Sequence, residues 1–104
     1  MNRYEVIVSE KAEQMLKYHI EYLSRVSISG AKKLRNAYRD VLEDLEWNPY
    51  LFPVSTRFSS GQNWRQALFY GRYQAIFRVE ENTVYLDAVV DCRMNPETIR
   101  RELE

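Results

Sequence analysis

Residues 64–79 read WRQALFYGRYQAIFRV, and this stretch decides the fold. Apolar and aromatic side chains recur at every second position in its second half, which is typical of a strand with one buried face. Tyr70-Gly71-Arg72 interrupts the pattern and is short enough for a hairpin turn. The stretch therefore predicts two antiparallel strands, Trp64–Tyr70 and Tyr73–Val79.

The alternating pattern continues downstream. Glu80-Glu81-Asn82 suits a second short turn, and Thr83–Val90 is rich in β-branched residues, so we expect a third strand of the same meander. Asn95 is a good helix cap and Pro96 suits the first helical position. A short terminal helix that ends at about Leu103 is therefore predicted.

Upstream of the meander the chain begins with another alternating stretch, Tyr4–Val8, which predicts a strand that Ser9 follows as a helix cap. Apolar residues then fall three or four positions apart over Glu10–Val26 and again over Gly30–Trp47. This spacing predicts two amphipathic helices that form an antiparallel hairpin. Asn48-Pro49 ends the second helix, because the residue before proline disfavours helical backbone.

The predicted order of elements is β-α-α-β-β-β-α, which is an α+β fold. The two helices must bury their apolar stripes, and one face of the sheet is the only partner large enough. We expect the helix hairpin to pack on one face of a small antiparallel sheet and to leave the other face partly open. A chain of 104 residues holds one domain, residues 1–104.

Composition excludes several classes of protein. Hydrophobic residues make up 45% and charged residues 29%, as in a globular domain, and the formal net charge is zero. A neutral chain does not hold long nucleic acid by bulk charge. The single cysteine, Cys92, cannot form an internal disulfide, and the apolar stretch near the N-terminus is too short for a signal peptide or membrane span. We therefore expect a cytoplasmic protein that does not bind membranes.

Charge is nevertheless segregated along the chain. Between Leu51 and Val79, which includes the predicted loop 51–63, the sequence has arginines but no Asp, Glu or Lys, whereas acids dominate from Glu80 onward. The strand periodicity predicts that the following residues are buried in the core: Tyr73, Ala75, Phe77, Val79, Val84, Leu86, Ala88 and Val90. The same periodicity predicts that Tyr85 and Val89 lie on the opposite side of the last strand. We expect the open face of the sheet to carry two acids, Asp87 and Asp91, and the residues Arg65, Gln74, Arg78 and Arg93. These arginines suit either cross-strand carboxylates, an acidic protein segment or nucleic-acid phosphates.

The ordered set of these elements resembles the RelE/ParE superfamily of toxins from type II toxin–antitoxin systems. The resemblance covers essentially the whole chain, and its elements are the following stretches: Asn63–Leu68, Tyr73–Val79, Val89–Arg93, the opening strand with Ser9, Glu10 and Ala12, and Leu45–Pro49. The resemblance implies a small toxin that inhibits growth and serves in plasmid stabilisation. An antitoxin neutralises such a toxin by wrapping around the toxin's helices and sheet. ParE-like members poison DNA gyrase, whereas RelE-like members cut messenger RNA in the ribosomal A site.

The ribonuclease pattern of RelE-like members is incomplete in this chain. Arg65 and Arg93 match basic positions of that pattern, but Ala67 and Gln74 replace two others, and Ile99 stands roughly where a terminal aromatic is expected. Arg65 and Arg93 are thus the candidates for stabilising charge in catalysis, although arginine is a poor proton shuttle. These departures from the ribonuclease pattern favour a ParE-like toxin over a ribonuclease. A degenerate, non-toxic binding module is the third alternative. Whether the chain is an enzyme therefore stays open.

For most of the remaining residues with reactive or aromatic side chains, we expect a packing role or a contact with a partner. His19 lies on the apolar stripe of the first helix and is expected to be a packed, hydrogen-bonded residue, and Cys92 a half-buried thiol. No metal-ligand spacing or phosphate loop is present, so we expect no metal and no cofactor. Residues expected to contact a target or an antitoxin are Arg65, Phe69, Arg72, Gln74, Arg78 and Arg93, with Phe52 and Phe58 as further exposed aromatics. Tyr18, Tyr22 and Tyr38 are expected to pack the hairpin or to form a homodimer contact.

Overall fold

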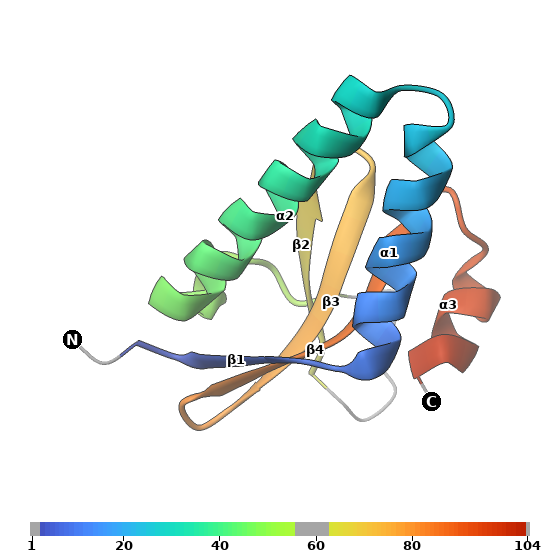
Figure 1. Cartoon of the computed structure of the whole chain (residues 1–104). Helices are drawn as coiled ribbons and strands as arrows, with labels where there is room; N and C mark the ends of the chain where they lie inside the picture. Colours follow the sequence, from blue (N-terminus) through green and yellow to red (C-terminus); the bar gives the residue numbers. More distant parts are fainter. Residues whose placement is uncertain (1–2, 56–62, 104) are drawn as a thin grey trace.

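The computed structural model describes residues 3–55 and 63–103. In chain order its elements are β1 (Glu5–Val8), α1 (Glu10–Ser24), α2 (Ile28–Trp47), the 3-10 turn η1 (Pro49–Leu51), β2 (Arg65–Phe69), β3 (Tyr73–Glu80), β4 (Thr83–Asp91) and α3 (Pro96–Leu103) (Figure 1). The α+β class and the order of strands and long helices predicted from the sequence are confirmed.

The four strands form one sheet in the order β1-β4-β3-β2. Strands β2, β3 and β4 are antiparallel neighbours, as predicted, whereas β1 runs parallel to β4. The sheet is therefore mixed rather than wholly antiparallel. No hairpin turn joins β1 to its neighbour, because two helices intervene, so the direction of β1 is not tied to that of β4.

A β-bulge in β4 changes which side chains face the helices. Ile76 pairs with Ala88 but Phe77 pairs with Leu86, which leaves Asp87 as an extra residue. One extra residue reverses the two-residue alternation of every side chain that follows it. Ala88 and Val90 are fully buried, as predicted, but they do not face the helix hairpin. Val89, predicted to lie opposite, packs with the helices instead, while Ala88 and Val90 pack on the other side of the sheet.

The helix hairpin packs on one face of the sheet, as predicted (Figure 1). Leu34 and Leu45 of α2 are fully buried there against Phe77 and Leu86. The opposite face carries a smaller buried cluster, Trp64, Ile76, Ala88 and Val90, which Met94 and Leu103 partly cover. The terminal helix α3 and Met94 before it thus cover part of the sheet face that was predicted to be open.

Helix α1 also seals the exposed edge of β4. Strand β1 ends at Val8, whereas β4 continues to Asp91, so the second half of β4 has no neighbouring strand on that side. Ser9 donates its backbone N–H to Leu86 O at 3.0 Å and its hydroxyl to Asp87 O at 3.3 Å. His19 Nε2 lies 3.0 Å from Val89 O. The helix therefore takes the place of an edge strand by satisfying carbonyls that would otherwise be open to solvent.

The helix ends follow local capping. Ser9 accepts from Ala12 N at 3.0 Å, as predicted. Helix α2 begins at Ile28 rather than Gly30 because Ser27 is its cap and accepts from Gly30 N at 2.9 Å. Over residues 3–55 and 63–103, no helix combines the length and the apolar character needed to cross a membrane.

Burial of Tyr38 predicts a loss of stability in alkali. Desolvation raises the pKa of Tyr38 from 10 to about 12, so the unfolded chain loses this proton at a lower pH than the folded one. Stability should fall by up to about 2 kcal/mol as pH rises from 10 to 12. In Tyr38→Phe this part of the fall should be absent from urea unfolding curves. Tyr18→Phe, at an exposed ring, is the control and should keep the parent profile; an unchanged profile in Tyr38→Phe would contradict this account.

Candidate functional site

A cleft of about 380 Å³ opens between α1 and the adjoining ends of β3 and β4, and we call it the α1–β4 cleft. Helix α1 supplies one wall, and the β2–β3 turn together with the segment after β4 supplies the other. The residues that line the cleft are Tyr18, His19, Tyr22, Arg72, Tyr73, Asp91, Arg93 and Met94. It combines charged, titratable and aromatic side chains in one concave surface, which is the usual setting of a binding site.

Asp91 organises the charges in the cleft. Its carboxylate accepts from Arg72 Nε at 3.2 Å and from Arg93 Nη2 at 3.0 Å, and it also accepts from the backbone N–H of Arg93 at 2.9 Å. The side chain of Asp91 is mostly buried, whereas that of Arg93 is 67% exposed. Two guanidinium groups around one carboxylate leave a net positive charge and several N–H donors that face solvent. The arrangement suits an anionic group of a partner.

His19 lies at the base of the cleft and is buried, as predicted. A carbonyl oxygen only accepts hydrogen bonds, so the contact with Val89 O requires a proton on Nε2. Desolvation by burial lowers the pKa of His19, despite the raising effects of this hydrogen bond and of Asp91. The ring lies 5.0 Å from that of Tyr73, whose own pKa burial raises. Both rings are therefore neutral near pH 7.

Arg65 does not lie on the open face. It pairs in register with Phe77, whose side chain packs under the helices, so Arg65 points to that same side. There Nη1 donates to Phe52 O at 2.7 Å, and the guanidinium lies 4.9 Å from the ring centre of Tyr50. The placement of Arg65 on the open face was wrong because the predicted strands were assigned to faces without their register.

Arg78 and Gln74 do lie on the open face, as predicted, and Arg78 is fully engaged there. Its Nε donates to Asp87 at 3.0 Å, its Nη1 donates to Glu80 at 2.8 Å, and its guanidinium lies 4.4 Å from the ring centre of Tyr85. Asp87 also accepts from Trp64 Nε1 at 3.0 Å. Of the alternatives for Arg78, ordinary pairing with nearby carboxylates is the one found. Gln74 pairs across strands with Leu68 and Val90.

Two aromatic residues expected to be exposed are not available to a partner. Phe69 is 5% exposed and packs between Tyr38 and Tyr73, so its assignment to a binding surface was wrong. Phe52 is half-buried, with its ring edge-on to Phe77. A strand position two residues from a buried alanine faces the core, and sequence reasoning gave that alternation too little weight. Phe58 lies outside the described residues.

The predicted site residues thus separate into three places. Arg72 and Arg93 meet in the α1–β4 cleft, Arg78 and Gln74 occupy the open face, and Arg65 lies under η1. Asp91 belongs to the cleft and not to the open face beside Asp87, because the bulge reverses its side.

Sequence reasoning missed the part of α1 that faces the cleft. Tyr18 is 65% exposed and Tyr22 is 52% exposed, whereas packing was expected for both; Tyr38 is buried as expected. The helical spacing of His19 and Tyr22, three residues apart, was the available signal that they share a face. The neighbour of that face was not visible in the sequence because it depends on the bulge in β4.

Within residues 3–55 and 63–103, no three His, Cys, Asp or Glu side chains come together as a metal-binding group. The absence of a metal and of a cofactor stays a prediction. No protein-family model matches the sequence, and no curated protein matches it at a significant level.

Removing the central carboxylate should destabilise the cleft. In Asp91→Ala the guanidinium groups of Arg72 and Arg93 lose their shared partner and repel each other, so we expect a loss of about 1–3 kcal/mol in the free energy of unfolding. Urea denaturation measures this loss. Glu80→Gln breaks an exposed ion pair with Arg78 and serves as the control, with a change below about 0.5 kcal/mol. Equal losses of stability in the two variants would show that Asp91 does not hold the charged groups of the cleft together.

Proposed function

We propose that this protein is the toxin component of a type II toxin–antitoxin module and that it acts by binding a protein target such as DNA gyrase. A cognate antitoxin holds it inactive. The proposal places the chain in the RelE/ParE superfamily, closer to its ParE-like branch. Its cytoplasmic location and any homodimer formation are part of the same proposal.

The class of toxin rests on the sequence elements and on their order in the fold. Trp64 directly precedes β2, which begins at Arg65; Tyr73–Val79 lies within β3; and Cys92-Arg93 directly follows Asp91, the last residue of β4. These are the elements on which the resemblance to RelE/ParE toxins depends. The helix hairpin packs on one face of a small sheet, as the order of these elements predicts.

One observation favours binding over RNA cleavage, namely that the two candidate catalytic arginines do not meet. Arg65 pairs with Phe77 towards one end of β3, whereas Arg93 follows Asp91, which pairs with Tyr73 at the other end. Phosphodiester cleavage needs its charge-stabilising groups around a single phosphorus atom. Arg65 and Arg93 therefore do not form one catalytic centre in this arrangement.

A second candidate function has a specific observation in its favour. The α1–β4 cleft holds Arg72 and Arg93 beside the neutral imidazole of His19, and a neutral imidazole is a competent general base. This grouping supports a RelE-like, ribosome-dependent endoribonuclease as the alternative. Against it, the carboxylate of Asp91 offsets the charge of the arginines. A non-toxic binding module is the third possibility.

Expression of the chain without its antitoxin tests these functions against one another. We expect growth arrest with double-strand breaks trapped by gyrase, and unchanged ends of messenger RNA. Codon-specific cleavage of messenger RNA instead would replace the proposal by the endoribonuclease alternative. No growth defect at all would leave only the non-toxic binding module.

Loss of the exposed guanidinium in the cleft should weaken toxicity. Because the side chain of Arg93 is 67% exposed although Asp91 holds its Nε and Nη2, Arg93→Ala should remove a contact to the target and reduce growth inhibition by about tenfold or more, as for a charged interface contact. Arg39→Ala, at an exposed position on the outer face of α2, is the matched control and should remain fully toxic. Dilution plating after induction measures both; full toxicity of Arg93→Ala would remove this residue from the proposed site.

A further inference from the structure

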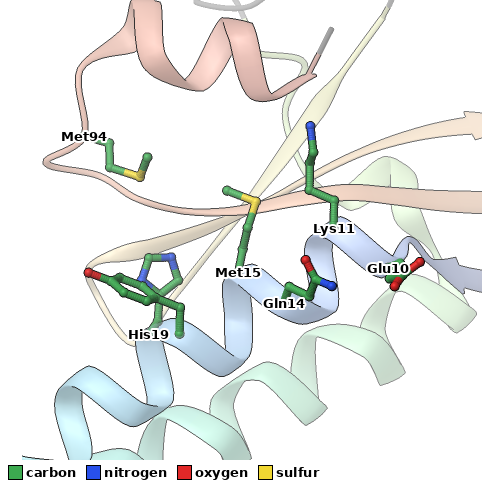
Figure 2. A pocket seen from close by; sticks show the side chains of 7 residues that line it. Glu10, Lys11, Gln14, Met15, His19 and Met94 are labelled. Carbon is green, nitrogen blue, oxygen red and sulfur yellow. The ribbon is translucent and has the colours of Figure 1, made fainter.

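A cavity of about 630 Å³ lies between α1 and the segment that leads into α3, and soft ligand atoms line it (Figure 2). Met15 and His19 project from α1, and Met94 enters from the other side of the cavity (Figure 2). The remaining lining residues are Glu10, Lys11, Gln14 and Tyr18. Two thioether sulfurs and one imidazole therefore share a single concave space, which adjoins the α1–β4 cleft through the lining residues that the two have in common, Tyr18, His19 and Met94.

The spacing of two of these ligands suits one ion. Met15 and His19 are four residues apart in α1, so they lie on the same helical face with Cβ atoms about 5–6 Å apart. Metal-binding helices use the same i, i+4 spacing when two of their side chains hold one ion. Met94 supplies a third ligand from a different element, and it packs against the same buried cluster as Met15.

The hydrogen bond of His19 prepares its ring for a ligand role. Nε2 donates to the backbone carbonyl of Val89 at 3.0 Å, which fixes the tautomer and leaves the lone pair on Nδ1. Histidines that bind metals usually donate their second ring N–H to a carbonyl or a carboxylate in this way. This contact is independent of the cavity and of the methionines, and it points to the same use of the ring.

The ligand set selects the ion. Thioether sulfur is a soft, uncharged donor that prefers Cu(I), whereas Ca²⁺ and Mg²⁺ require oxygen ligands. Methionine side chains have three rotatable bonds, so Met15 and Met94 can change rotamer to approach an ion in the cavity. We propose that Met15, His19 and Met94 form a binding site for Cu(I).

Occupancy of this site has a structural consequence. Met94 lies between β4 and α3, so an ion held by Met94 and by the two α1 ligands would tie the start of the terminal segment to α1. Metal binding would thereby stabilise the folded protein through ligands that the unfolded chain does not bring together.

Competition with a chromogenic Cu(I) chelator, under anaerobic reducing conditions, tests the site on the purified full-length chain. We expect one equivalent of Cu(I) to bind, and we expect Met15→Leu and Met94→Leu each to weaken binding by at least about tenfold. Leucine has a similar volume, so both variants should fold, and circular dichroism checks this. Cys92→Ser is the matched control, because Cys92 carries the single thiol of the chain and lies close to Met94 in sequence, and this variant should bind as the parent does.

A second measurement locates the ion. In the protein labelled with carbon-13 at the methionine methyls, Cu(I) should shift the signals of Met15 and Met94, which their leucine variants assign. Parent-like affinity in both folded leucine variants would overturn the proposal. Loss of binding in Cys92→Ser, or no competition with the chelator by the parent protein, would overturn it as well.

Discussion

The extra residue in β4, Asp87, sets which side chains face the helices and which face away from them. Before the bulge, Leu86 packs under the hairpin; after it, Val89 does so, and Asp91 follows on the same side. Without that shift Asp91 would point to the open face and could not hold Arg72 beside α1. The bulge is thus the constraint on which the cleft depends, as is common for bulges near functional sites.

The short length of β1 determines how the edge of β4 is protected. Because β1 is short, the carbonyls of the second half of β4 need other partners, and Ser9 and His19 of the first helical segment supply them. An edge strand without such partners invites pairing with other chains. The same contacts fix the distance between α1 and the sheet and the tautomer of His19. His19 lines both the α1–β4 cleft and the cavity that holds Met15 and Met94, so its hydrogen bond to Val89 O orients a side chain that both share.

Periodicity alone predicted most of the fold, because hydrophobic spacing is a local property. The helix pair, the three-strand meander and the cap at Ser9 follow from residues close to one another in the chain. The site was harder to predict because it depends on register and on the bulge. Arg65 and Asp91 were assigned to the wrong side for these two reasons, and Phe69 was expected at the surface although its strand partners are buried. The direction of β1 likewise depends on a distant pairing that no local pattern encodes.

We propose that the protein binds a protein target and is not a nuclease, because its arginines are engaged by Asp87, Asp91 and a backbone carbonyl at separate places. An assay with purified components tests this claim most directly. The chain is added to DNA gyrase, ATP and closed circular DNA, and in parallel to ribosomes programmed with messenger RNA. The account predicts gyrase-dependent accumulation of linear DNA and intact messenger RNA. Cleaved messenger RNA with unaffected gyrase would contradict it.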